Sequence, residues 1–254
     1  FDIESTDLEA IMDDHYLSPL RVAATSGVAA QHLVPQDATR MGLFGTGEQA
    51  GPQLEVFHHL CDFDEIAVYS PTRDHREEFA DQYNDQFDAT VQALEDPQAV
   101  VEGSDVVVTA TNSNDPVFDG AWLDPGTHVS TTVGGDYSSE RDEIDATTIH
   151  RADRIYCNRF QQLLDDRQGN LYELLDSGEL TREDVAELGE LVAGEAASRD
   201  SSEEITLMKN NCGMGLQFAG TASLIHDRAK KRDLGRELPQ EWFVTSKDGE
   251  EWSP

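Results

Sequence analysis

Short apolar blocks alternate with amphipathic stretches along most of this chain. The strand-like blocks lie at 41–45, 65–70, 105–111, 127–133, 154–157 and 204–208. Between them, helix-like segments lie at 49–61, 75–83, 99–102, 140–149 and 181–192. Regular alternation of strands and helices is typical of a parallel sheet covered by helices. The pattern therefore predicts an α/β protein with a doubly wound, Rossmann-like parallel sheet.

The two ends of the chain follow a different pattern. Two apolar stretches within residues 1–12 flank a polar tetrapeptide, which predicts a β-hairpin. Ser18-Pro19 is a typical helix start with proline in the first turn, and an Ala-rich helix is predicted over 20–32. A long last helix is predicted over 213–231.

The net charge narrows the classes of function. Fifty-one Asp and Glu residues against eighteen Lys and Arg residues give a formal charge of −33 at pH 7 and a pI near 4.2. Binding to nucleic acid or to anionic lipid needs a basic face, so both classes are disfavoured. No apolar run approaches the roughly 20 residues of a membrane span. The expected partner is therefore a small molecule, with no nucleic acid and no membrane.

The composition also predicts an environment. Only four of the basic residues are lysines. Acid-rich, lysine-poor surfaces suit molar salt, where charge repulsion is screened within about 3 Å, so a halophile's protein is expected. The three cysteines, Cys61, Cys157 and Cys212, are well separated and form neither a disulfide framework nor a CxxC pair. A reducing cytoplasm is the expected location.

The sharpest local signal is a glycine motif between a predicted strand and a predicted helix. It reads Gly45-Thr46-Gly47-Glu48-Gln49-Ala50. In a GxGxxA turn the first glycine permits a tight bend, the second lets a pyrophosphate approach, and the alanine keeps the helix close to the sheet. The helix N-terminus then offers N–H groups to the phosphates. A dinucleotide site is predicted here, and a plain structural turn is the alternative.

The end of the second predicted strand bears on the choice of coenzyme. An NAD site usually has an acidic residue there, which bonds the ribose 2′-hydroxyl. This chain has Ser70, Thr72 and Arg73 instead, a set that can hold a 2′-phosphate. NADP(H) is therefore favoured over NAD(H). The alternative is that Arg73 only begins the next helix in solvent.

Two further strand ends are expected to border the coenzyme. Thr109, Ala110 and Thr111 end the most β-like run, and Val133 and Gly134 follow the next strand. Open α/β sheets bind ligands at the carboxyl ends of their strands, so both groups are predicted on one rim. For the second group, a simple glycine loop is the alternative.

Seven stretches, found in order along nearly the whole chain, carry a resemblance to a known family. They lie at 20–24, 45–50, 101–111, 125–129, 151–154, 187–194 and 203–209. The last two are the most specific, because other Rossmann proteins do not share them. They read Glu187-Leu188-Gly189-Glu190-Leu191-Val192-Ala193-Gly194 and Glu203-Glu204-Ile205-Thr206-Leu207-Met208-Lys209. On these residues the chain resembles the ornithine cyclodeaminase/mu-crystallin family.

The resemblance implies two domains and a role for one arginine. A Rossmann domain over 33–210 is paired with a second, incomplete domain built from the chain ends, 1–32 and 211–254. That domain faces the substrate and makes the dimer, so a homodimer is implied. Members use a nicotinamide coenzyme to move hydride between an amine and an imine beside a carboxylate. By similarity, Arg21 binds the substrate carboxylate through its bidentate fork, and an ordinary exposed helix-start arginine is the alternative.

The sequence departs from the family pattern in three respects. The family has a substantial N-terminal portion, with further basic residues that include a lysine, before the point where this sequence begins. A fragment of a longer protein is therefore one interpretation. The cyclodeaminases carry an aspartate where this chain has Asn158, the candidate catalytic position, and an amide cannot accept a proton as a carboxylate does. Phe218 stands where many relatives have an acidic residue.

Three functions are compatible with these residues. The leading hypothesis is an NAD(P)H-dependent oxidoreductase that reduces imines of 2-oxo acids or oxidises the matching amino acids. The second is ornithine cyclodeaminase, against which Asn158 counts. The third is a non-catalytic protein that binds NADPH and small ligands. No metal is expected, since the eight histidines show no HExxH spacing. His128 is a candidate general acid, with a structural role as the alternative.

Overall fold

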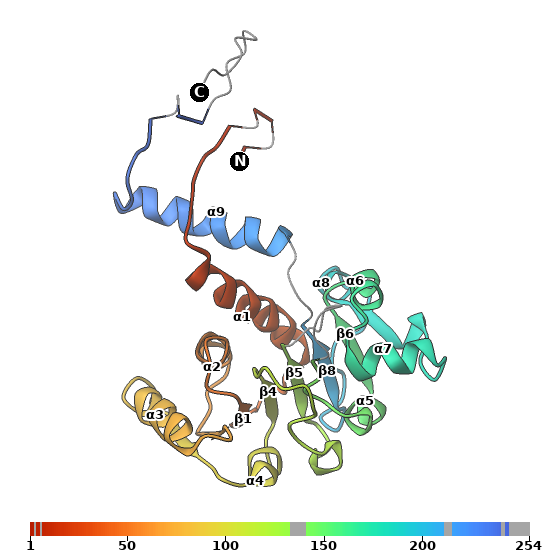
Figure 1. Cartoon of the computed structure of the whole chain (residues 1–254). Helices are drawn as coiled ribbons and strands as arrows, with labels where there is room; N and C mark the ends of the chain where they lie inside the picture. Colours follow the sequence, from red (N-terminus) through yellow and green to blue (C-terminus); the bar gives the residue numbers. More distant parts are fainter. Residues whose placement is uncertain (3, 6, 133–140, 211–214, 240–241, 244–254) are drawn as a thin grey trace.

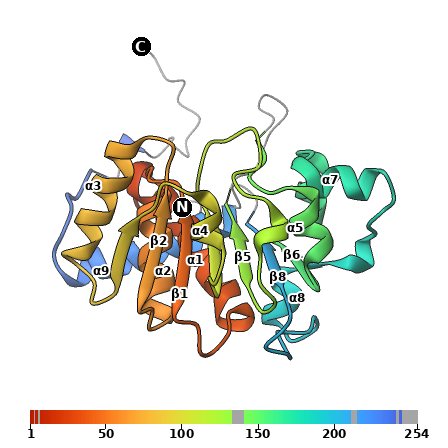
Figure 2. The same cartoon turned by 90° about the horizontal axis from the view of Figure 1, so that it is seen from below.

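A single parallel sheet forms the centre of the molecule. The computed structural model describes all residues except 3, 6, 133–140, 211–214, 240–241 and 244–254. In this described part, eight strands lie in the order β3-β2-β1-β4-β5-β8-β6-β7, and every pairing is parallel (Figure 1 and Figure 2). The predicted Rossmann-like sheet is thus confirmed. The strands are β1 (Arg40–Phe44), β2 (Glu65–Tyr69), β3 (Thr90–Ala93), β4 (Val106–Thr109), β5 (His128–Thr131), β6 (Arg154–Cys157), β7 (Val185–Glu187) and β8 (Thr206–Lys209).

Helices cover both faces of the sheet. One face carries α1 (Asp14–Leu33), α2 (Ala50–Leu60), α3 (Arg73–Asn84) and α8 (Leu188–Val192). The other carries α4 (Pro97–Val101), α5 (Ala146–Arg151), α6 (Phe160–Asp165) and α7 (Gly169–Asp176). Alternate strand residues enter opposite layers, so Leu43 packs in one core cluster and Phe44 in the other. Burial on both faces explains why the central strands are almost continuously apolar.

Two helices, one near each end of the chain, pack against each other. Gly27 lets α1 approach α2 closely, because a Cβ atom there would lie 2.4 Å from Cγ1 of Val56. The last helix, α9 (Gly215–Lys231), lies away from the sheet and packs beside α1 (Figure 1). The contact includes a hydrogen bond of 2.9 Å from Arg21 Nη1 to Gln217 Oε1. Residues from the first and last parts of the chain therefore share one surface.

The prediction for the first residues is wrong. No strand forms among the described residues of 1–13, and α1 begins at Asp14, earlier than expected. Asp13 caps this helix, since its carboxylate accepts a hydrogen bond from His15 N. Pro19 consequently lies inside the helix and not in its first turn.

The predicted helix over 181–192 is also wrong. This segment is a 3₁₀ turn (η2, Arg182–Asp184), then β7, then α8. The backbone groups of β7 pair with those of β6 and add a strand to the sheet, so this stretch is extended and not helical. The sequence pattern also missed α6, α7, a short 3₁₀ turn (η1, Gly120–Trp122) and the edge strand β3, in which Val91 alone is fully buried.

Candidate functional site

The glycine turn lies between β1 and α2, next to β4. Strand order reverses between β1 and β4, which makes this the topological switch point of the sheet. Gly45 has a φ of +106°, and a Cβ atom there would lie 2.2 Å from the carbonyl oxygen of Ala110. Its N–H donates to Tyr69 O at 2.9 Å. A residue with a side chain cannot occupy this position without moving the end of β4.

The second glycine is open to an approaching group. A Cβ atom on Gly47 would have no neighbour within 4 Å, and the residue is exposed. Helix α2 begins three residues later with the fully buried Ala50, and its N-cap, Gln49, makes no side-chain capping bond. Thr46 is half-buried and Glu48 is exposed. An uncapped helix start behind an open glycine is the arrangement that fits a pyrophosphate.

The residues after β2 divide into exposed and buried groups. Thr72 and Arg73 are exposed, and Arg73 Nε donates to Glu77 Oε1 at 2.7 Å, a bond that raises the pKa of Arg73. Ser70 is buried, and its carbonyl oxygen accepts a bond of 3.1 Å from Nη1 of Arg76. Sequence reasoning missed Arg76, although its spacing from the buried residues of α3 marks it as part of the buried helix face.

A buried carboxylate joins the ends of β4 and β5. Glu143 is fully buried, and the described threonines donate five hydrogen bonds of 2.6 to 3.2 Å to it. The donors are the hydroxyls of Thr109, Thr111 and Thr131 and the backbone N–H groups of Thr111 and Thr132. The structure thus brings Thr109 and Thr111 together, with Ala110 buried between them.

Glu143 was missed because nothing in the sequence distinguishes it from the other acidic residues. The predicted coenzyme residues Val133 and Gly134 lie outside the described residues.

The candidate substrate residues also lie at this end of the sheet. Arg21 is buried, and its guanidinium carbon lies 4.8 Å from the ring centroid of Phe218. Asn158 follows β6, and its Nδ2 donates to Oδ1 of Asn210 at 2.7 Å. Asn210 in turn donates to Val22 O, the residue next to Arg21, at 2.8 Å. The buried Asn210, which sequence reasoning missed, therefore connects Asn158 to α1.

His128 lies at the opposite end of the sheet. It begins β5, whereas the residues above follow the carboxyl ends of their strands. Its Nδ1 lies 2.8 Å from Thr206 Oγ1, and burial, followed by the nearby charge of Arg199, lowers the pKa of His128 to about 3. The ring is therefore neutral near pH 7 and is positioned for a structural role.

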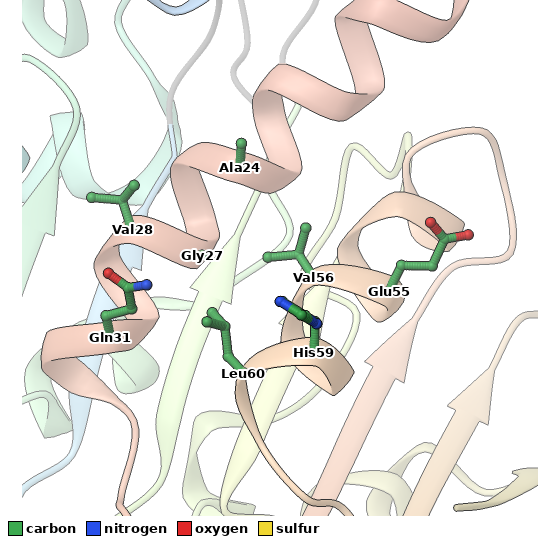
Figure 3. Close-up of a pocket in the computed structure, with 8 residues that line it drawn as sticks. All are labelled: Ala24, Gly27, Val28, Gln31, Glu55, Val56, His59 and Leu60. Carbon is green, nitrogen blue, oxygen red and sulfur yellow. The ribbon is translucent and has the colours of Figure 1, made fainter. Parts of the chain in front are cut away.

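Other kinds of site find no support among the described residues. No group of three or more His, Cys, Asp or Glu side chains in that part of the chain could hold a metal ion. None of its helices has the length and apolar character needed to cross a bilayer. A hollow of about 360 Å³ lies between α1 and α2, lined by Ala24, Gly27, Val28, Gln31, Glu55, Val56, His59 and Leu60 (Figure 3). It adjoins the second half of α2 and not the glycine turn that precedes the helix.

Comparison with known proteins decides the family. The model of the ornithine cyclodeaminase/mu-crystallin family matches residues 1–233. This chain belongs to that family. It is 28% identical to a Δ1-pyrroline-2-carboxylate reductase of Bacillus cereus over 238 residues, which are 93% of this chain and 72% of the relative.

Two solved structures extend the comparison. The fold is similar to that of Thermococcus litoralis Δ1-pyrroline-2-carboxylate reductase in complex with NADH and L-proline, with a TM-score of 0.86 at 25% identity. The similarity covers 93% of this chain and 72% of the Thermococcus chain. An archaeal alanine dehydrogenase dimer with bound NAD gives a TM-score of 0.84 at 27% identity, covering 94% of this chain and 72% of that one. The family therefore contains members with reductase and dehydrogenase names and a nicotinamide coenzyme bound.

Proposed function

We propose that this family member is an NAD(P)H-dependent oxidoreductase that reduces imines of 2-oxo acids or oxidises the matching amino acids. The observation that carries the proposal is the open glycine turn at the switch point, with Arg21 at the same end of the sheet. When bound, a nicotinamide coenzyme supplies or accepts the hydride. The names of the related reductase and dehydrogenase support this class of reaction.

The coenzyme would be held by backbone groups more than by side chains. Gly45 and Gly47 keep the turn tight and accessible, and the start of α2 presents N–H groups and positive dipole to the phosphates. Thr109, Ala110 and Thr111 would border the nicotinamide ribose. Such a cradle would hold the pyrophosphate at the switch point through backbone groups.

Arg21 would bind the carboxylate of the imine. The guanidinium contacts the neutral side chains of Gln217 and Phe218. A carboxylate approaching this fork would gain two parallel, charge-assisted hydrogen bonds. Catalysis would then depend mainly on holding the imine carbon against the coenzyme and away from water.

The amide at Asn158 supports a reductase over ornithine cyclodeaminase. Its Nδ2 already donates to Asn210, and an amide cannot take a proton from a substrate's second amine. A substrate with one amine, or a cyclic imine, needs no proton acceptor at Asn158 and therefore suits this amide better than a diamine does.

NADP(H) is the proposed coenzyme. The sequence from Tyr69 to Arg73 holds no acidic residue that would repel a 2′-phosphate. Arg73 would meet that phosphate by exchanging its bond to Glu77. NAD(H) is the alternative, since the related structures carry NADH or NAD.

The domain and assembly proposals rest on the two end segments. Residues 1–32 and 211–254 would form the substrate and dimerisation domain, with the Rossmann domain over 33–210. Exposed apolar side chains on α1 and α9, among them Tyr16, Leu216 and Leu224, support a homodimer through this surface. A cytoplasm of high salt remains the proposed setting, supported by the acidic composition.

The test is direct titration followed by turnover. In molar KCl, NADPH and NADH fluorescence should change on binding, and the protein should consume reduced coenzyme with a cyclic ketimine or with pyruvate plus an amine. Binding of coenzyme without turnover of any such substrate would instead support a ligand-binding protein. Absence of binding by either coenzyme would contradict the proposal. Retention of fold and activity in dilute buffer would contradict the high-salt setting.

A further inference from the structure

Glu143 is a buried carboxylate at the place where two coenzyme-bordering strands end. It lies just before α5 and is fully excluded from solvent. Its Oε1 accepts from Thr111 N at 2.6 Å and from Thr111 Oγ1 at 2.8 Å. Its Oε2 accepts from Thr109 Oγ1, Thr131 Oγ1 and Thr132 N. A single side chain thereby fixes the positions of two strand ends.

The backbone around Glu143 reinforces the same connection. Its carbonyl oxygen accepts from Val117 N at 3.0 Å, which ties the loop after β4 to it. Thr132 Oγ1 donates to Thr109 O at 2.9 Å, a second link between the two strand ends. The end of β4 also touches the glycine turn, where Gly45 has no room for a side chain beside Ala110 O. The rim is therefore continuous from the turn to β5.

The location distinguishes the two halves of a dinucleotide. The pyrophosphate binds at the β1–α2 turn, and the ribose that carries the 2′-hydroxyl or 2′-phosphate lies at the end of β2. The other half of the molecule must then lie over β4 and β5, on the far side of the switch point. The hydrogen bonds that Glu143 accepts from described residues come from the ends of β4 and β5.

We infer that Glu143 is a positioning residue for the nicotinamide half of the coenzyme. It acts through Thr109, Thr111 and Thr132, which it holds in place. This inference rests on the proposed function, because it requires that a nicotinamide dinucleotide binds here.

A carboxylate suits this position better than an amide. Two backbone N–H groups, of Thr111 and Thr132, point at different oxygens of Glu143. In the variant Glu143→Gln, one oxygen becomes an NH₂ group that faces one of these donors whichever way the amide turns. One strand end must then move, while the size of the side chain stays the same.

The experiment compares a complete coenzyme with half of one. Dissociation constants are measured for NADH and for ADP, which lacks the nicotinamide and the ribose attached to it, with the wild type, Glu143→Gln and the control Asp145→Asn. Asp145 is a matched carboxylate, which accepts three bonds at the start of α5 from Gly120 N, Thr148 N and Thr148 Oγ1. Thermal melts monitor folding in parallel.

Glu143→Gln should weaken NADH binding about tenfold and leave ADP binding within about twofold, because the strand end that moves borders only the nicotinamide half of the ligand. Asp145→Asn should leave both constants within about twofold of the wild type. Equal weakening of both ligands by Glu143→Gln, or unchanged NADH binding, would overturn the inference.

A milder variant keeps the test valid if Glu143→Gln does not fold. Thr131→Val removes one donor to Glu143 and keeps the shape of the side chain. It should weaken NADH binding about threefold without affecting ADP binding, and equal shifts for both ligands would again refute the inference. Wild-type protein that binds none of NADH, NADPH and ADP would refute the proposed function itself, a result that no variant can imitate.

Discussion

The proposed coenzyme side of the site is built from strand ends and short turns, whereas the proposed substrate side is built from two helices and a pair of amides. On the first side, Gly45 and Ala110 meet through backbone atoms. On the second, Arg21 meets Gln217 through side chains that lie 196 residues apart in the sequence. Backbone contacts tolerate no change of shape, while side-chain contacts can be exchanged one at a time. If the proposed assignments hold, coenzyme binding would depend on the fold itself, and substrate choice would depend on a few side chains that can be replaced.

The largest effect is expected from Gly45→Ala on the coenzyme side. The new Cβ atom would clash with Ala110 O, and the residue would be held at a positive φ. Stability should fall by about 2–4 kcal/mol and coenzyme binding should be lost. Denaturant melts and NADH titrations measure the two effects.

Gly47→Ala is the matched control for that variant. Its Cβ atom meets no neighbour within 4 Å, so the protein should keep its stability and lose only coenzyme affinity. Equal stability of the two variants would contradict the difference assigned to the two glycines.

A smaller effect, confined to the substrate, is expected from Arg21→Ala. Loss of the charged fork should raise KM for the imine about 10- to 100-fold, which corresponds to a lost charge-assisted bond. Coenzyme affinity should stay unchanged, because Arg21 belongs to the other side of the site. Arg21→Lys should recover only part of the loss, since an ammonium group lacks the bidentate geometry. A change in NADH affinity as large as the change in KM would show that the two sides are not separate.

A smaller role is expected for His128, which lies at the amino end of the sheet, away from the coenzyme and substrate sides of the site. Its pKa is lowered from 6.5 to about 3 in the folded protein. Between these values the unfolded chain binds the proton, so the stability contributed by the neutral ring is fully present above pH 6.5 and is lost as the pH falls toward 3. The expected slope is about 1.4 kcal/mol for each pH unit.

Unfolding curves at several pH values compare the wild type with His128→Gln, which should lack this slope. His75→Gln, at an exposed position, serves as the control. Coenzyme affinity at pH 7 should be the same in all three proteins. An acid slope that is identical in the wild type and His128→Gln would contradict the assignment.

The smallest effect is expected at the end of β2. Arg73→Ala should weaken NADPH about three- to tenfold and leave NADH unchanged, because an exposed charge is screened by salt. Glu77→Gln, which releases Arg73 from its ion pair, should shift NADPH affinity the other way. Parallel shifts for NADPH and NADH in both variants would remove Arg73 from the coenzyme site.

The glycine turn could be predicted from the sequence because its signal is local. A strand, two glycines and a helix follow one another within a few residues, and their geometry follows from backbone freedom alone. The segment 181–192 could not be predicted, since its apolar spacing fits a helix as well as a strand followed by a short helix. Pairing with β6 decided between them. Edge strand β3 was missed because it is short and only half-buried.

The residues missed at the site share a different cause. Glu143 acquires its role from threonines up to 34 residues away, and Asn210 from a carbonyl 188 residues away. Acidic residues are so frequent in this sequence that the composition does not distinguish Glu143, the one that is fully buried among the described residues. Such roles arise only when the sheet brings distant segments together, so no pattern along the chain marks them.

Tight packing at Gly27 joins α1, which carries Arg21, to α2, which follows the glycine turn. The two helices pack so closely that a side chain at position 27 would have no room beside Val56. If the coenzyme binds as proposed, this packing would limit changes in the gap between the Arg21 guanidinium and the coenzyme. Ligands one methylene longer or shorter would be sorted by that gap even though every polar group they meet is the same.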